Sequence, residues 1–142
     1  MQFGIRALRM TQPESVIQAT FHRHLSLYGG SLVMGFSVPN ERKASKSATG
    51  RLKAQGLVKG ACDYVVLWPE GGALIEFKTP TGRVQPEQED FGNRATSIGW
   101  PYRVCRSWQE AFAFIEQAGA PLQRVLREEP YERFVLAEKA GV

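Results

Sequence analysis

The sequence predicts a single α/β domain in which helices flank a mixed β-sheet. Three observations support this prediction. The chain has 142 residues, which is enough for one hydrophobic core and too short for two full domains. Apolar residues make up 43% and charged residues 23% of the chain, as in ordinary globular proteins. Segments with helical periodicity alternate with short apolar segments, in the order α-β-(α)-ββ-α-β-α.

A first helix is expected over about residues 12–28, because one stripe of mostly apolar residues recurs there at helical spacing. Thr11 and Glu14 have the spacing of a capping box, and Pro13 suits the first turn of a helix. Two glycines then end the helix. A short strand is expected to follow over residues 31–38.

The middle of the chain predicts a basic loop and helix followed by a β-hairpin. Residues 44–55 can form the helix. Residues 62–68 are almost continuously apolar, so we expect a strand that is covered on both faces. Residues 69–72 form a turn cluster, and residues 73–79 complete the hairpin.

The last third of the chain predicts a helix over residues 86–98, a strand over residues 102–105 and an amphipathic helix that ends near residue 119. We therefore expect residues 1–119 to form the folded domain. Residues 120–142 contain two short apolar patches and are expected to form a helical extension that joins either the core or a dimer contact.

The positive charge of the chain is concentrated in one segment. The formal net charge is +4, and the pI is about 9.3. No acidic residue lies between positions 42 and 59, where the basic residues are Arg42, Lys43, Lys46, Arg51, Lys53 and Lys59. A local positive field of this kind suits a phosphate backbone, although a solvated basic loop and helix would have the same composition.

Membrane-spanning, secreted and disulfide-stabilised proteins are disfavoured. The longest purely apolar run, Tyr64–Trp68, is far shorter than the roughly 20 residues that span a bilayer. The first ten residues contain no apolar block of signal-peptide length. The two cysteines are too few for a disulfide scaffold or a four-thiolate zinc site. We therefore expect a soluble, cytoplasmic protein without a membrane partner.

Asp63, Glu76 and Lys78 form the most informative pattern, because these charged residues occur within an apolar hairpin. Glu76 and Lys78 are two apart and therefore share one face of their strand. If the turn has four residues, Trp68 faces Ala73, Asp63 lies opposite Lys78, and Glu76 is its diagonal neighbour. A slip of one residue would send Asp63 to the other face of the sheet.

This cluster has a chemical interpretation and a structural one. Two carboxylates a few ångströms apart can hold Mg²⁺ or Mn²⁺, which prefer oxygen ligands. Such a metal polarises a phosphoryl oxygen and lowers the pKa of a bound water, and a lysine can orient that water. The structural alternative is an ordinary ion pair at an exposed end of the hairpin, and the spacing alone does not separate the two.

Several short motifs in this order resemble the VRR-NUC domain of the PD-(D/E)xK nucleases, especially its small stand-alone form found in phages. The resemblance covers about residues 12–118 and implies a restriction-endonuclease-like α-β-β-β-α-β core, with residues 1–119 as the nuclease domain. Cys62 departs from the pattern, because the family usually has proline there. The motifs are SVPN, RLKAQGLVKG, GACD, IEFK and QPEQ.

The resemblance also implies a role for each residue of the candidate site. Asp63 and Glu76 would be metal ligands together with the backbone carbonyl of Phe77, and Lys78 would be the catalytic lysine. Glu14 matches the N-terminal acidic residue of the family and is a further candidate ligand, unless it only caps its helix. The matched catalytic set is Glu14, Asp63, Glu76, Lys78 and Gln88.

These expectations amount to a DNA endonuclease that uses Mg²⁺ or Mn²⁺ and acts in the cytoplasm of a bacterial or phage-infected cell. The resemblance implies a homodimer that cleaves branched DNA, such as a four-way junction. The alternatives are a non-catalytic DNA-binding module of the same fold and a restriction-type enzyme for duplex DNA. The residues expected to bind the DNA backbone are Lys43, Lys46, Arg51, Lys53 and Lys59.

Overall fold

A computed structural model describes residues 12–39 and 46–123 of the chain. In these residues the four strands form one sheet in the order β1-β2-β3-β4. The elements are α1 (Glu14–Tyr28), β1 (Met34–Ser37), α2 (Lys46–Ala54), β2 (Tyr64–Trp68), β3 (Gly71–Phe77), α3 (Pro86–Ser97), β4 (Tyr102–Cys105) and α4 (Trp108–Gln117).

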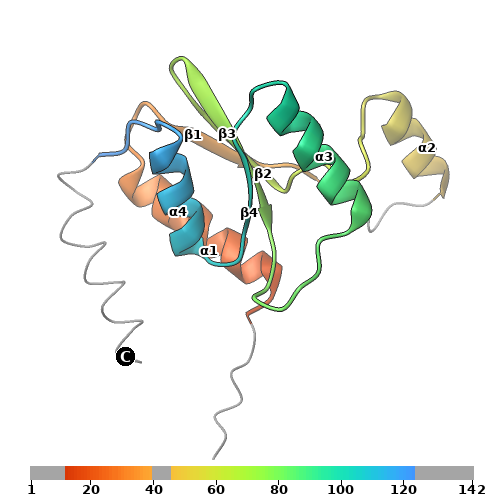
Figure 1. The fold of residues 1–142 in the computed structure, drawn as a ribbon, viewed down its shortest axis with the longest axis horizontal. Helices are drawn as coiled ribbons and strands as arrows, with labels where there is room; N and C mark the ends of the chain where they lie inside the picture. The colour runs from red at the N-terminus through yellow and green to blue at the C-terminus, as the bar shows by residue number, and fades with distance from the viewer. Residues whose placement is uncertain (1–11, 40–45, 124–142) are drawn as a thin grey trace, which may run out of the picture.

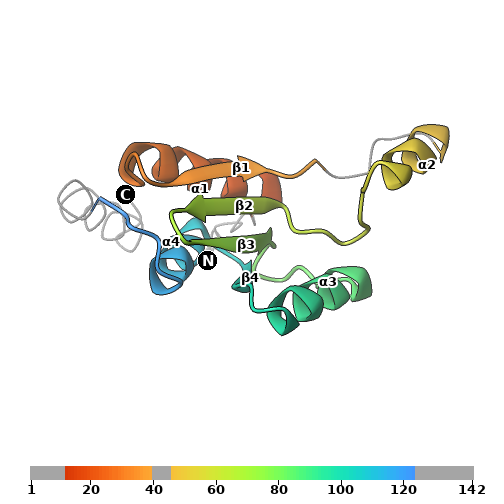
Figure 2. The same ribbon diagram turned by 90° about the horizontal axis from the view of Figure 1, so that it is seen from above.

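The sheet is mixed, as the sequence predicts. β1, β2 and β3 pair antiparallel, whereas β4 lies parallel to β3. Helices α1 and α4 cover one face of the sheet, and α3 lies on the other side (Figure 1). The same arrangement is seen from above in Figure 2, where α2 lies at the far end of the molecule from α4. The order of the elements confirms the predicted α/β fold.

The hydrophobic core lies between the sheet and the α1–α4 layer. Phe21 of α1 is fully buried, and its ring meets the ring of Tyr64 edge-on with 5.2 Å between centroids. The Phe21 ring also contacts Phe77 of β3 and Phe112 of α4. Alternate residues of β2 and β3 therefore point into this core, and the residues between them point to the opposite face.

The opposite face of the sheet is only partly covered. Leu67 of β2 is 37% exposed, and Met34 and Phe36 of β1 are 59% and 42% exposed. The prediction that both faces of the second strand are covered is therefore wrong. The reason is that α3 packs mainly over β4, while α2 lies away from the sheet (Figure 2).

The hairpin between β2 and β3 has a shorter turn than the sequence suggested. Trp68 pairs with Gly71, so the turn has two residues, Pro69 and Glu70, and the expected pairing of Trp68 with Ala73 is wrong. Gly71 belongs to the strand because the Trp68 indole packs across it, and a Cβ at Gly71 would lie 2.5 Å from the indole nitrogen. The pairing therefore shifts by two residues, which leaves every side chain on its predicted face.

The last described residues continue the core. Ala120 and Leu122 are 7% and 9% exposed and belong to the same hydrophobic cluster as α1 and α4. The remainder of the predicted extension, residues 124–142, lies outside the described residues, so the division at residue 119 stays a prediction. In the described residues, no helix combines the length and the apolar character that a membrane span requires.

Gly35 allows α1 to approach the sheet closely, and this contact can be tested. A Cβ at Gly35 would lie 2.5 Å from both Leu25 Cδ2 and Tyr64 Oη. Gly35→Ala is therefore expected to lower the free energy of unfolding by about 1–3 kcal/mol in urea denaturation. Gly50→Ala is the matched control, because nothing lies within 4 Å of a Cβ at that α2 position. Equal stability of the two variants would contradict this account of the packing.

Candidate active site

Asp63 is held in place by both strands that flank it. Its backbone N–H donates to the carbonyl of Ile75 (3.1 Å), and its carbonyl accepts from Val38 N (2.8 Å). The Asp63 carboxylate accepts a hydrogen bond from Phe77 N (2.8 Å). One residue beyond the Tyr64–Ile75 pair, Asp63 comes level with Glu76, and not with Lys78 as the predicted register had it. The two acids are therefore direct neighbours.

Glu76 carries a carboxyl group that is almost completely buried, at 1% exposure. Its Oε1 accepts a hydrogen bond from Gln88 Nε2 (2.6 Å). Its Oε2 is buried and has no hydrogen-bond partner among the described residues. Burial, followed by the charge of Asp63, raises the pKa of Glu76 to about 8, and the nearby Lys78 opposes this effect. Asp63 is therefore close enough for its negative charge to disfavour ionisation of Glu76.

Lys78 is also buried, at 3% exposure, and lies directly after β3. Its Nζ lies 3.8 Å from Glu14 Oε1, in the first turn of α1. Pro13 is the N-cap of α1 and makes no side-chain cap bond, so Glu14 is the first residue of the helix and not the third residue that the predicted capping box requires. Its partner in that prediction, Thr11, lies outside the described residues. Glu14 is therefore available to pair with the lysine.

The first turn of α3 supplies the amide that contacts Glu76. The backbone N–H of Gln85 donates to Gln88 Oε1 (2.9 Å), which is the side-chain bond of a capping box. Gln88 Nε2 is then left to donate to the carboxylate. The sequence signal for this arrangement was the QPEQ segment, where a glutamine stands three residues after the N-cap. Both ends of the Gln88 amide are therefore fixed.

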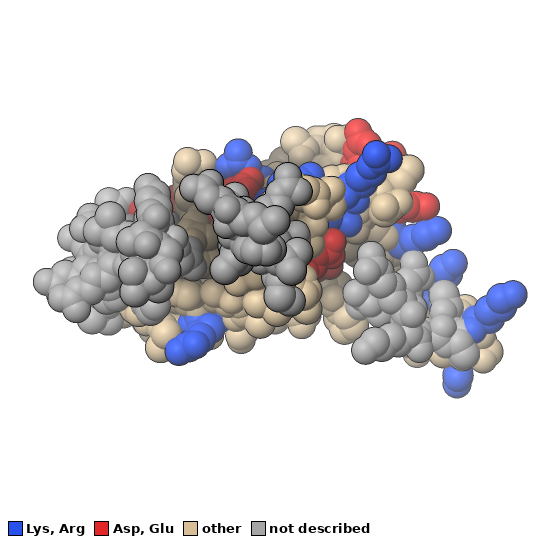
Figure 3. Space-filling view, turned by 90° about the horizontal axis from the view of Figure 1, so that it is seen from below, with Lys and Arg blue, Asp and Glu red and all other residues tan. Residues whose placement is uncertain are grey.

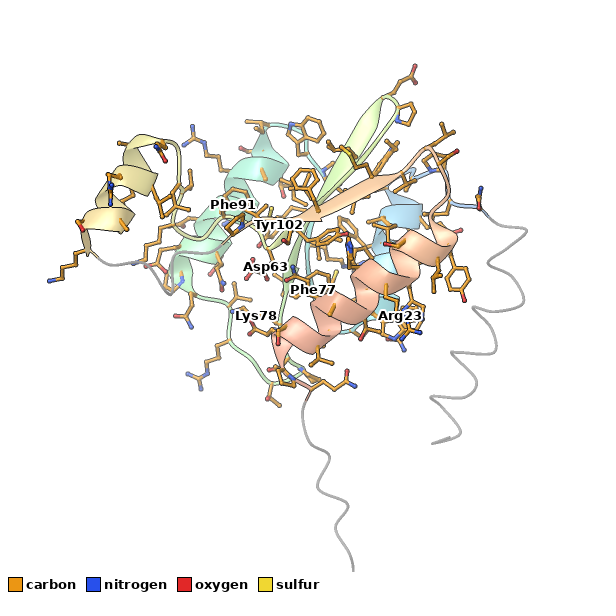
Figure 4. The ribbon with its side chains drawn as sticks, turned by 180° about the vertical axis from the view of Figure 1, so that it is seen from behind. Arg23, Asp63, Phe77, Lys78, Phe91 and Tyr102 are labelled. Carbon is orange, nitrogen blue, oxygen red and sulfur yellow. The ribbon has the colours of Figure 1, made fainter. Side chains whose placement is uncertain are left out.

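The five predicted site residues, Glu14, Asp63, Glu76, Lys78 and Gln88, converge at one end of the sheet. They come from the first turn of α1, the start of β2, the end of β3 and the first turn of α3. Figure 4 labels Asp63 and Lys78 in this region. The chemical role of each residue, including the Phe77 carbonyl as a ligand, stays a prediction.

The acids fit a divalent cation as a pair. The half-buried Asp63 carboxylate and the buried Glu76 carboxyl group, whose Oε2 has no partner among the described residues, are a donor set for Mg²⁺ or Mn²⁺, which take oxygen ligands and keep several waters. Across the described residues, no group of three His, Cys, Asp or Glu side chains is suited to hold a metal. Asp63 and Glu76 would therefore need water and backbone oxygens as further ligands, while Glu14 contacts Lys78.

The basic residues proposed for the DNA backbone lie on and after α2. Lys46, Arg51 and Lys53 are exposed on that helix. Figure 3 shows several basic side chains gathered at this end of the molecule. Lys59 is exposed too, and its Nζ lies 3.3 Å from Glu87 Oε1. Lys43 lies outside the described residues.

One supporting residue, Arg106, had no clear signal in the sequence. Arg106 Nη1 donates to the carbonyls of Thr79 and Gly82, both at 2.7 Å, and so holds the loop that follows Lys78. A single arginine after a short strand does not predict such a contact. Cys62, which stands where the family usually has proline, is buried, and burial raises the pKa of its thiol to about 11. This thiol therefore stays protonated at neutral pH.

Comparison with known proteins identifies the family. The VRR-NUC domain matches residues 12–109, which is most of the chain. The chain belongs to the VRR-NUC domain family. VRR-NUC domains are nucleases, so the family implies a nuclease that acts on DNA.

The fold of a solved VRR-NUC protein agrees with this assignment. That structure, a VRR_NUC domain protein, has a TM-score of 0.62 to this chain at 14% sequence identity. The alignment covers 76% of this chain and 88% of the other. A comparison with curated proteins finds no match. At this level of identity, the likeness to the solved VRR-NUC structure shows the fold alone.

The raised pKa of Glu76 predicts how the stability of the metal-free protein depends on pH. The folded state raises this pKa from 4.5 to about 8, so it holds the Glu76 proton more tightly than the unfolded chain does. The resulting stabilisation is complete below the unfolded-state pKa and is lost as the pH rises through the folded-state pKa. Between about pH 5 and pH 8, the free energy of unfolding should therefore fall by roughly 2–4 kcal/mol more in the wild type than in Glu76→Gln.

Urea denaturation in EDTA at several pH values measures this difference. Glu76→Gln is the matched control because it keeps the shape of the side chain and removes the titrating group. Parallel pH profiles for the two proteins would contradict the assignment of a raised pKa to Glu76.

Proposed function

We propose that this protein is a divalent-metal-dependent endonuclease that hydrolyses phosphodiester bonds in branched DNA. The observation that carries the proposal is the half-buried Asp63 beside the buried Glu76 and Lys78, with one carboxyl oxygen of Glu76 that has no partner among the described residues. An ionised carboxylate is costly to bury unless it is paired or binds a cation, so a bound cation would stabilise the ionised form of Glu76. Membership in the VRR-NUC family supports nuclease chemistry at the same place.

Mg²⁺ or Mn²⁺ would be held by the Asp63 and Glu76 carboxylates together with the Phe77 carbonyl. When bound, such an ion supplies Lewis-acid polarisation of a phosphoryl oxygen and a lowered pKa for a coordinated water. Each carboxylate is already oriented by the protein, Asp63 through Phe77 N and Glu76 through Gln88 Nε2. Outer contacts of this kind fix the ligand geometry before the cation arrives.

Lys78 is the residue proposed to act on the nucleophile. Hydrolysis adds the water oxygen to phosphorus, breaks one P–O ester bond and places a proton on the leaving oxygen. A buried ammonium group near Glu76 can orient the attacking water and offset negative charge on the phosphoryl oxygens. Glu14, which lies 3.8 Å from Lys78 Nζ, would hold that amine in position.

The exposed basic residues of α2 would bind the phosphate backbone. Lys46, Arg51 and Lys53 have no acidic neighbour in their segment, so their field is uncompensated locally. Phosphate contacts of this kind position a substrate without reading its sequence. With Lys43 and Lys59, they would guide DNA toward the end of the sheet that carries the acids.

Cleavage assays test the proposal. With Mg²⁺ or Mn²⁺, the wild type is expected to nick four-way DNA faster than flap, duplex or single-stranded DNA, and EDTA is expected to stop the reaction. Lys78→Ala and Asp63→Ala should each lower the rate by at least about a hundredfold, because each removes a group that acts on the reacting phosphate. Glu70→Gln, at the exposed turn between β2 and β3, is the control and should cleave like the wild type.

The outcomes separate the alternatives. Wild-type rates in both Lys78→Ala and Asp63→Ala would end the assignment of the site. Junction binding with a steep salt dependence and no cleavage with either metal would favour a non-catalytic DNA-binding module. Equal or better cleavage of duplex DNA at defined sequences would favour a restriction-type enzyme.

A homodimer is part of the proposal, because one site can cut only one strand at a time and paired nicks at a junction need two. Light scattering of the full chain is expected to give twice the mass of 15.9 kDa. A chain truncated after Gln123 keeps the core residues Ala120 and Leu122 and tests whether the remaining residues are needed for assembly. A monomeric full chain that still makes paired nicks would contradict the dimer.

A further inference from the structure

The loop between α2 and β2 touches the beginning of α3 through a glycine. Ala61 N donates to the carbonyl of Val58 (3.1 Å), which closes a tight turn with Gly60 at its third position. Gly60 has φ of 82°, the value that this position of a type II turn requires. Glycine is therefore favoured at position 60 by the conformation of its own backbone.

Gly60 also has no room for a side chain. A Cβ there would lie 2.3 Å from the carbonyl oxygen of Glu87, 2.4 Å from its carbonyl carbon and 2.8 Å from Gln88 N. All three are backbone atoms of the first turn of α3. A side chain at position 60 would therefore force this helical turn to move. On the surface beside this contact, Lys59 Nζ lies 3.3 Å from Glu87 Oε1. The loop and the first turn of α3 are therefore in direct backbone contact.

The rest of α3 is fixed by a second close contact, so its first turn cannot simply slide away. A Cβ at Gly92 would lie 2.3 Å from Tyr102 Cε1 on β4. The Tyr102 ring also meets the ring of Phe91 at 6.0 Å between centroids, and the two are seen together in Figure 4. A steric clash between a Cβ at position 60 and the start of α3 would therefore tilt or unwind the first turn of the helix, where Gln88 lies.

We propose that Gly60 is a positioning residue for the active site. Through its contact with the first turn of α3, it places the Gln88 amide on Glu76 Oε1 and leaves Oε2 for the cation. The same loop leads directly into Asp63, whose own position is fixed by backbone bonds to the flanking segments. This inference rests on the proposed function and adds to it a residue that touches neither the substrate nor the metal ligands.

Gly60→Ala and Gly56→Ala form a matched pair for testing this role. Both glycines have positive φ, 82° and 108°, so alanine strains the backbone at either position. Nothing lies within 4 Å of a Cβ at Gly56, whereas a Cβ at Gly60 meets the backbone of α3. A difference between the variants therefore reports the contact with α3 and not the strain of the turn.

The first measurement is independent of activity. The side-chain amide signals of Gln88 are recorded by NMR in ¹⁵N-labelled protein and assigned by their loss in Gln88→Ala. In the wild type, the bond to a carboxylate should set them apart from those of exposed glutamines. Gly60→Ala should move them toward the values of exposed glutamines, and Gly56→Ala should leave them in place.

The second measurement is the cleavage rate on the best DNA substrate. Gly60→Ala should lower kcat by about tenfold or more, with KM changed by less than about threefold, because it disturbs the support of a metal ligand and not DNA binding. Gly56→Ala should stay near the wild type. The double variant Gly60→Ala/Gln88→Ala should be no slower than Gln88→Ala alone, because both changes act through one amide.

Equal behaviour of Gly60→Ala and Gly56→Ala in both measurements would overturn the positioning role, even if the wild type cleaves DNA. If the wild type cleaves no DNA, the proposed function fails, and the Gln88 signals still decide whether Gly60 places that amide. Should Gly60→Ala not fold, Lys59→Glu at low salt repels Glu87 without adding a Cβ and should move the same signals in part. Unchanged Gln88 signals in that variant would also overturn the role.

Discussion

The pairing of β2 with β3 brings two carboxyl groups together, and the rest of the site is arranged around this contact. Asp63 and Glu76 are neighbours because both strands hold the Asp63 backbone and Phe77 N holds its carboxylate. Burial of Glu76 disfavours its ionised form, and the neighbouring Asp63 charge adds to this effect, so the pKa of Glu76 is raised. The fold maintains this unfavourable contact by supporting it from several sides.

That support comes from the first turns of two helices on opposite sides of the sheet. Gln88 of α3 donates to Glu76, and Glu14 of α1 pairs with Lys78. Both contacts are possible because the site lies where β3 ends, so a helix from either layer can reach it. β4 runs parallel to β3, so the two strands end on the same side of the sheet. Arg106 follows β4 and donates hydrogen bonds to the loop after Lys78. The end of the sheet that carries the site is therefore surrounded by short segments held by hydrogen bonds and an ion pair.

Sequence patterns predicted the helices and strands well, because hydrophobic periodicity follows directly from which face of each element is buried. They also placed Asp63, Glu76 and Lys78 on one face, which holds for any even shift in register. The register itself was misjudged because Gly71 and Gly72 read as turn residues, whereas the packing of Trp68 against Gly71 puts them in the strand. That contact is between side chain and backbone and leaves no local pattern in the sequence.

The other misjudged features depend on contacts between distant segments. Thr11 and Glu14 have capping-box spacing, yet α1 begins at Glu14, and Gln85 and Gln88 form a complete capping box at the start of α3. Glu14 pairs instead with Lys78, which is far away in the chain. Leu67 is exposed because neither α2 nor α3 covers this part of the sheet. The periodicity of a helix does not predict which strand the helix packs against.

The turn of the β2–β3 hairpin lies at the opposite end of its strands from the carboxylates. Asp63 and Trp68 are five positions apart, which is roughly 16 Å along the strand. Pro69 and Glu70 are exposed there, and the backbone bonds around Asp63 hold the other end of the hairpin independently. A short peptide tag inserted between Pro69 and Glu70 would therefore be attached to the central strands at the end away from the candidate active site.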